Sequence, residues 1–131
     1  MTADRKDVLA ALAVLAVDQI SKIWVTAGAP AVFSARQTAG IVFGFDLPGT
    51  WDFYVVAPLL LAFIFLHIRY LRASPANLGG AFVIGGAVSN LADRLAGGTV
   101  TDFLNLGFTT MNFADLAIFA GLGIIIYRSE A

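Results

Sequence analysis

Four long apolar stretches restrict what this chain can fold into. A transmembrane helix needs about 20 predominantly apolar residues, and the segments that approach this length are residues 8–27, 53–71, 78–95 and 113–127. Only 13% of the residues are charged, against roughly 25% in soluble globular domains. The sequence therefore predicts an all-α membrane protein, a four-transmembrane-helix bundle that occupies residues 1–131 as one domain. Because the last segment is short, we expect its helix to start among the residues just before it and to cover residues 112–128.

Lysine and arginine residues predict the orientation of this bundle. Short cytoplasmic loops carry the excess of these residues. Here they precede the first segment and follow the second and the fourth, at Arg5, Lys6, Arg69, Arg72 and Arg128. The other two connections carry only Arg36 and Arg94. Both termini are therefore expected in the cytoplasm.

The connection over residues 28–52 is too polar to cross a membrane. It is rich in Val, Phe and Ile with partial alternation, and Gly40 and Gly44 interrupt it. Such a pattern favours one or two short strands. We expect them in a small β-containing loop region on the extracytoplasmic side.

The composition excludes several classes of protein. A net charge of −1 leaves no basic stripe for nucleic acid. The absence of cysteine removes disulfides, thiol nucleophiles and thiolate metal sites, and we expect no metal and no cofactor. The N-terminal segment could instead be a signal peptide ending at residues 27–29, but a signal's apolar core is about 7–15 residues long and lacks charges such as Asp18 and Lys22.

Charged residues within the first and third segments predict buried pairing. Asp18 and Lys22 are four residues apart and share a helical face, so they can pair, for structure alone or for function. In the third segment, Asn90, Asp93 and Arg94 project from one side of the helix. We expect Asp93 to pair with Arg94 or with Lys22. The same segment has a face of small residues that lets another helix approach closely, formed by Gly79, Gly80, Gly85, Gly86, Ala87 and Ser89.

Two aspartates, Asp102 and Asp115, lie in the run "TVTDFLNLGFTTMNFADLAIF", which is almost wholly apolar or small. The β-branched "TVT" predicts a short extended piece that carries Asp102, and Asp115 lies three residues after Asn112, which predicts a shared helical face. Two adjacent carboxyl groups at a lipid boundary do not both ionise cheaply, so one keeps its proton and the other acts as a base. This is the arrangement of an aspartic protease. Alternatively, Asp115 is a helix N-terminal acid and Asp102 a loop residue.

Five motifs along the chain resemble those of the lipoprotein signal peptidases, or type II signal peptidases, of bacterial inner membranes. They are "DQISK" at residues 18–22, "TAGIVFG" at 38–44, "GGAVSNLADR" at 85–94, "GGTVTDF" at 97–103 and "NFADLAI" at 112–118. The resemblance implies an aspartic-type endopeptidase with Asp102 and Asp115 as its catalytic pair. It implies that a further set of residues supports the site or binds substrate, namely Asp18, Lys22, Thr38, Gly40, Asn90, Arg94 and Asn112.

The same resemblance implies the substrate and the location. The substrate would be a diacylglyceryl-modified prolipoprotein, cut just before its lipidated cysteine, and the site would lie near the extracytoplasmic face of the inner membrane. Membrane lipids and cyclic peptide inhibitors of the globomycin type would be further partners, and the protein would act as a monomer.

The chain departs from the family's usual motifs at three positions. Thr38 stands where the loop motif usually has Asn, Val42 where it has Ala, and Ser89 where the third-segment motif has Gly. A threonine hydroxyl cannot replace both the donors and the acceptor of an amide. The first extracytoplasmic loop is also shorter than expected, which predicts a reduced lid.

Two other functions are compatible with the sequence. A catalytically inactive relative would bind lipidated signal peptides without cutting them. A small ion-coupled transporter would also carry acids in membrane helices, but near the midplane, whereas these lie at one edge.

Overall fold

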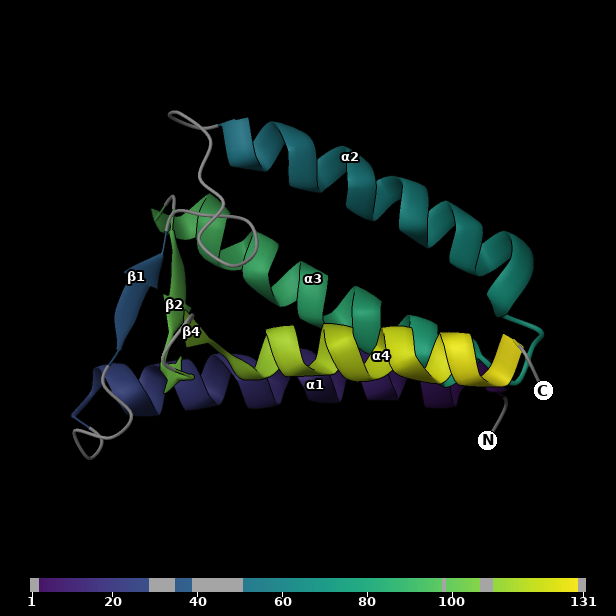
Figure 1. Cartoon of the computed structure of the whole chain (residues 1–131), viewed down its shortest axis with the longest axis horizontal. Helices are drawn as coiled ribbons and strands as arrows, with labels where there is room; N and C mark the ends of the chain where they lie inside the picture. The colour runs from purple at the N-terminus through teal and green to yellow at the C-terminus, as the bar shows by residue number, and fades with distance from the viewer. Residues whose placement is uncertain (1–2, 29–34, 39–50, 98, 107–109, 130–131) are drawn as a thin grey trace.

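The computed structural model describes residues 3–28, 35–38, 51–97, 99–106 and 110–129. Within them, four α-helices follow one another along the chain at the predicted places (Figure 1). A π-helical turn, η2, continues the second helix over His67–Leu71. The α-helices are α1 (Ala3–Thr26), α2 (Trp51–Leu66), α3 (Asn77–Gly97) and α4 (Phe113–Ser129).

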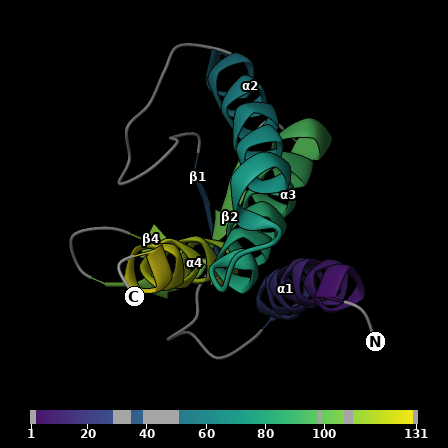
Figure 2. The same ribbon diagram turned by 90° about the vertical axis from the view of Figure 1, so that its right-hand side faces the viewer.

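The third helix lies at the centre of the bundle. Figures 1 and 2 show α3 with α2 along one side and α1 and α4 along the other, and α3 contacts all three. Both ends of the chain lie at one end of the bundle, and the strands lie at the opposite end (Figure 1). The strand end therefore holds the last turns of α1 and α3 and the first turn of α4.

Glycine residues allow α3 to approach its neighbours closely. The sequence predicted this from the small residues on one face of the third segment. A Cβ atom added at Gly79 would lie 2.6 Å from the carbonyl oxygen of Gly121 in α4, and one added at Gly85 would lie 2.6 Å from that of Ala11 in α1. Real Cβ atoms do not come this near, so the backbones touch only because side chains are absent. Such contacts are typical of helix packing in membranes.

We expect Gly121→Ala to destabilise the bundle by about 1–3 kcal/mol, because overpacking of a tight interface forces the backbone to shift. The new methyl group would meet the Gly79 carbonyl and would lie 2.8 Å from the Val83 side chain. Gly123→Ala is the matched control, since nothing lies within 4 Å of its added Cβ. Thermal unfolding in detergent should show a lower midpoint for the first variant only, and equal midpoints would contradict this account of the packing.

Many of the exposed side chains of the bundle are apolar, and several of its buried side chains are polar. Its exposed side chains include Ile20, Ile23 and Leu61, each about two-thirds exposed, whereas the largest fully buried side chains are Asn112, Asp18 and Ser89. A lipid solvent favours this distribution, because polar groups in it must find partners within the protein. Two described segments, Arg5–Thr26 and Tyr54–Leu71, are long and apolar enough to cross a membrane by themselves.

Two small antiparallel sheets close the strand end. Strand β1 (Arg36–Thr38) pairs with β2 (Val100–Asp102), with Arg36 opposite Asp102 and Thr38 opposite Val100. Strand β3 (Leu104–Asn105) pairs with β4 (Thr110–Met111). The extended piece that carries Asp102 is thereby confirmed, and one strand lies in the 28–52 connection. Gly40, Val42 and the rest of their motif after Thr38 lie outside the described residues.

The fourth helix starts one residue later than the predicted residue 112. Helix α4 begins at Phe113 and ends at Ser129, because the residues just before it belong to β4 and because Asn112 caps the helix instead of joining it. Asn112 and Asp115 therefore do not share a helical face. They meet across the cap.

Candidate active site

Buried polar side chains from three helices and one strand meet at the strand end of the bundle. Six of them are less than a tenth exposed: Asp18 and Lys22 from α1, Ser89 and Asn90 from α3, Asp102 from β2, and Asn112 before α4. Asp115, in the first turn of α4, is half-buried. The sequence predicted that all of these residues except Ser89 share a site, and the structure brings them into one hydrogen-bond network.

Asn112 joins the two aspartates. Its side-chain amide donates to Oδ1 of Asp102 at 2.9 Å, and its backbone N–H donates to Oδ2 of Asp115 at 3.2 Å. Asn112 is fully buried, and its amide also lies within hydrogen-bond distance of the Thr101 carbonyl, at 3.2 Å. One fully buried asparagine therefore donates hydrogen bonds to both carboxyl groups.

The cap of α4 fixes the place of Asp115. The Asn112 side-chain oxygen accepts from the Asp115 backbone N–H at 2.9 Å, while the Asp115 carboxylate accepts from the Asn112 N–H. This reciprocal pair satisfies two N–H groups that have no partner within the helix, as in a capping box. A carboxylate in the first turn also interacts favourably with the helix dipole. Asp115 therefore does occupy the helix N-terminal position considered for it, and Asn112, which caps the same helix, also donates to Asp102.

Lys22 is the cation at the centre of the network. Its Nζ lies 2.5 Å from Oδ2 of Asp18 and 2.7 Å from Oδ2 of Asp93, and it donates to Oδ1 of Asn90 at 3.1 Å. The predicted pairing of Asp18 with Lys22 is confirmed, and of the two partners expected for Asp93, Lys22 makes the ion pair. Two helices are held together by these contacts, α1 through Asp18 and Lys22 and α3 through Asn90 and Asp93.

Asn90 connects Lys22 with Asn112 and Asp115 through hydrogen bonds. Its oxygen accepts from Lys22 and from the Asn112 amide at 3.0 Å, and its own amide donates to Oδ1 of Asp115 at 2.9 Å. Both carboxylate oxygens of Asp115 thus face N–H donors. Asp102 accepts from Asn112 at one oxygen and faces the Thr110 hydroxyl at 3.4 Å with the other.

Two predicted site residues lie at the margin. Arg94 is half-buried in the last turn of α3, and the network described above does not include it. Thr38 lies in β1, two positions along the strand pair from the one that faces Asp102. Gly40 belongs to the undescribed part of the chain.

Gln19 and Ser89 belong to the network but were not predicted as site residues. The Gln19 amide donates to Oγ of Ser89 and to Oδ1 of Asp93, both at 2.9 Å. Ser89 was noted only as part of the small-residue face and as a departure from glycine. A sequence signal did exist for Gln19, which stands beside Asp18 in the "DQISK" motif.

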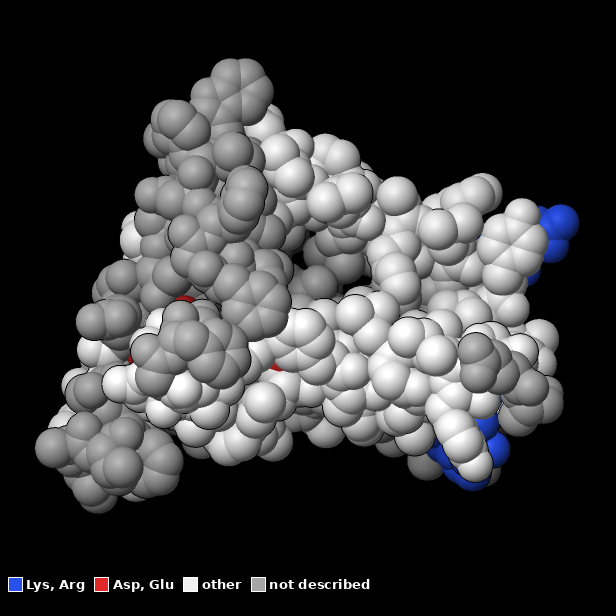
Figure 3. All heavy atoms as spheres, viewed as in Figure 1, with Lys and Arg blue, Asp and Glu red and all other residues white. Residues whose placement is uncertain are grey.

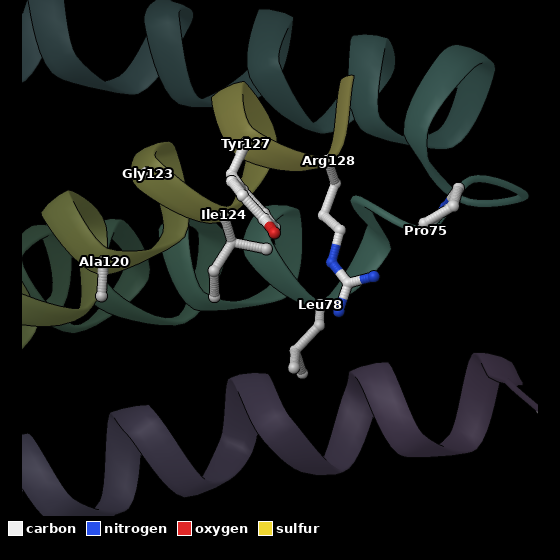
Figure 4. Close-up of a pocket in the computed structure, with 7 residues that line it drawn as sticks. All are labelled: Pro75, Leu78, Ala120, Gly123, Ile124, Tyr127 and Arg128. Atoms are coloured by element: carbon white, nitrogen blue, oxygen red, sulfur yellow. The ribbon is translucent and has the colours of Figure 1, made fainter. Parts of the chain in front are cut away.

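The arrangement provides acid–base chemistry. It contains two carboxyl groups that accept hydrogen bonds from the same asparagine, at one end of the bundle. Carboxyl groups that lie close together favour one protonated and one ionised acid. Among the described residues, no three His, Cys, Asp or Glu side chains are grouped as metal ligands. A pocket of about 410 Å³ between the start of α3 and the end of α4 lies at the opposite end of the bundle, lined by Leu78, Ile124, Tyr127 and Arg128 among others (Figure 4). It takes no part in this site.

Fold and site together define a helical membrane enzyme of the aspartic type. The family model for signal peptidase (SPase) II matches residues 10–130. The chain belongs to the signal peptidase II family, as its motifs predicted, and it is a bacterial membrane protein.

Individual relatives cover most of the chain. A protein named lipoprotein signal peptidase from Shewanella amazonensis is 35% identical, over 88% of this chain and 82% of its own length. Another of that name, from Symbiobacterium thermophilum, is also 35% identical, over 90% and 89%. Two structures described as bacterial membrane enzymes, solved by the in meso method, share the fold. Each has a TM-score of 0.77 over 93% of this chain; they cover 85% and 90% of their own chains at 21% and 23% identity.

Proposed function

We propose that this protein is an intramembrane aspartic endopeptidase that removes signal peptides from lipoproteins, with Asp102 and Asp115 as its catalytic pair. Membership of the signal peptidase II family supports the reaction. The observation that carries the assignment of the pair is that both carboxyl groups are hydrogen-bonded to the same buried residue, Asn112. The family comparison favours neither the transporter nor the inactive binding protein.

In the proposed mechanism the two acids share one proton. The ionised carboxylate takes a proton from a water molecule, which attacks the scissile carbonyl carbon, while the protonated carboxyl group donates to the carbonyl oxygen. As the C–N bond breaks, the carboxyl group that took the water proton donates it to the leaving amine. The other carboxylate takes a proton from a hydroxyl of the intermediate, which leaves the pair with one proton again. Amides suit the supporting positions because Asn112 and Asn90 hold the acids without competing for the proton.

The remaining predicted residues act on this pair indirectly. Lys22 and Asp18 hold α1 against α3 and α4. Asn90 accepts from Lys22 and donates to Asp115, so it connects Lys22 with the catalytic pair. We assign Arg94, Thr38 and Gly40 to substrate binding or to support of the site, as the family resemblance implies. The substrate is a diacylglyceryl-modified prolipoprotein, cut before its lipidated cysteine.

The same proposal places all four helices across the inner membrane as one domain, with the site at the outer face. Five basic residues, Arg5, Lys6, Arg69, Arg72 and Arg128, belong to the end of the bundle that holds the termini, and the Lys and Arg side chains visible in Figure 3 gather at that end. The acidic network lies at the other end. Positive charge marks the cytoplasmic side.

We therefore expect reporter tags at Met1, Ala73 and Ala131 to be cytoplasmic and one near Gly49 to be extracytoplasmic. A pair of reporters, one active only in the cytoplasm and one only outside it, would be fused at each position. If the fusion at Ala73 is active outside the cytoplasm, the proposed orientation and the location of the site are wrong.

The direct test of function is cleavage of a substrate by the purified protein. Incubation in detergent with a lipidated preprolipoprotein should yield the shortened product, and the unlipidated precursor should remain uncut. Chelators and reagents for thiols or serines should leave the rate unchanged, because the mechanism uses none of these groups. Binding of the lipidated substrate without cleavage would favour the inactive relative, and ion flux into liposomes would favour the transporter.

A further inference from the structure

The hydroxyl group of Ser89 lies between two side chains of α1. Ser89 is fully buried, and its Oγ donates to Oδ2 of Asp18 at 2.6 Å while it accepts from the Gln19 amide at 2.9 Å. A hydroxyl that accepts from one fixed partner has its own hydrogen directed toward the other. Gln19 therefore orients Ser89, and Ser89 holds one oxygen of the Asp18 carboxylate.

The other oxygen of Asp18 caps α4. Its Oδ1 accepts from the backbone N–H of Ala114 at 2.8 Å. Ala114 is the second residue of α4, where N–H groups have no partner within the helix, and it directly precedes Asp115. A carboxylate from the first helix thus completes the N-terminus of the fourth, beside the Asn112 cap.

The backbone of Ala114 is held on its second side by α3. A Cβ atom added at Gly86 would lie 2.5 Å from the Ala114 carbonyl oxygen, so the peptide rests directly on the α3 backbone. With its N–H bound to Asp18 and its carbonyl against Gly86, Ala114 cannot move unless Asp18 does. The position of Asp18 therefore sets the position of the residue that follows Ala114.

We propose that Ser89 is a positioning residue for Asp115 and that it acts through Asp18 and the Ala114 N–H. The proposal rests on the proposed catalytic role of Asp115. The hydroxyl is a property of this chain, because the motif that it resembles usually has glycine at this position. Ser89 thus supplies a contact to Asp18 that a glycine cannot make.

Removal of the hydroxyl should affect geometry more than stability. Without Oγ, the Gln19 amide keeps two acceptors, the Ser89 carbonyl at 3.2 Å and Asp93 at 2.9 Å. Oδ2 of Asp18 keeps Lys22, so no polar group is left without a partner. Oδ2 of the carboxylate is then held by Lys22 alone, so the carboxylate can turn away from Ala114.

The test compares Ser89→Ala with Ser21→Ala. Ser21 is a matched control because its hydroxyl donates only to carbonyls of its own helix, those of Val17 and Asp18. For Ser89→Ala we expect kcat for a lipidated substrate to fall about tenfold with KM unchanged, because misplacement of a reacting group lowers the rate of the chemical step. We also expect the Ala114 amide, followed by NMR in detergent, to exchange about tenfold faster as its local protection is lost. Ser21→Ala should change neither quantity.

Either of two results would overturn the proposal: a kcat for Ser89→Ala within about twofold of the control, or unchanged exchange at Ala114. The exchange measurement does not depend on catalysis. If an Asp115→Asn variant proves fully active, the proposed function fails, while the exchange rate at Ala114 still shows whether Ser89 acts on the cap of α4.

Discussion

Replacement of Asp102 or Asp115 by asparagine should abolish cleavage of a lipidated substrate. Each member of the pair must both lose and gain a proton during the reaction, and an amide can do neither. General acid–base catalysis contributes about 10²–10⁴-fold to a rate, so each single variant should lose at least that much of its kcat. The measurement is the initial rate of product formation in the same detergent as the wild type.

The contacts of the two acids predict that both variants fold. At position 102 an amide oxygen can accept from Asn112 as the carboxylate does, and the amide nitrogen can face the Thr110 hydroxyl. At position 115 both oxygens accept from N–H groups, of Asn90 and of Asn112, so an amide loses one bond. We therefore expect Asp115→Asn alone to be destabilised, by about 1 kcal/mol.

Asp7→Asn is a matched control, since Asp7 lies at the other end of the bundle, where it accepts from the Asn77 side chain. It should cleave at the wild-type rate. The double variant Asp102→Asn/Asp115→Asn should be hardly slower than either single one, because residues that act as a unit are not additive. Substantial turnover by either single variant would rule out the aspartyl mechanism.

The sequence predicted the parts of the fold that depend on local composition. Apolar length located four helices, because a segment in apolar surroundings must satisfy its own backbone hydrogen bonds. The spacing of Asp18 and Lys22 predicted their pairing, since residues four apart on a helix are neighbours. The glycines of α3 predicted close packing, although nothing in the sequence identified Ala11, Ala114 and Gly121 as their partners.

The contacts that were not predicted depend on tertiary structure. The pairing of β1 with β2 joins segments more than 60 residues apart, and no local pattern specifies such a register. Asn112 was expected inside a helix because its spacing from Asp115 fits either a helical face or a cap. Strand β4 ends at Met111, directly before Asn112, so the helix cannot extend further back and Asn112 takes the cap position. Ser89 and Gln19 carry no charge, and no local pattern predicts that Ser89 binds Asp18 or that Gln19 binds Ser89 and Asp93.

Replacement of Lys22 by methionine should destabilise the protein more than any other single change in the network. Methionine has a similar length but no charge, so Asp18 and Asp93 would lose the cation that pairs with both, and Asn90 would lose a donor. Loss of one partner of a buried ion pair costs about 3–5 kcal/mol, because it leaves an uncompensated charge. We expect a much lower unfolding midpoint in detergent and loss of cleavage. Lys6→Met is the matched control, since Lys6 is exposed and surface changes are usually within about 0.5 kcal/mol.

A second substitution separates the effect of the unpaired charge from a loss of packing. In Lys22→Met/Asp18→Asn the fully buried carboxylate is neutral, and its amide oxygen can still accept from the Ala114 N–H. Because removal of both partners of a buried pair costs far less than removal of one, the double variant should recover part of the unfolding midpoint that Lys22→Met loses, while Asp93 still lacks its cation. Cleavage should stay impaired, since Asn90 still lacks the Lys22 contact that helps to hold it beside Asp115. A double variant no more stable than Lys22→Met would show that Lys22 stabilises the bundle by packing and not by its charge.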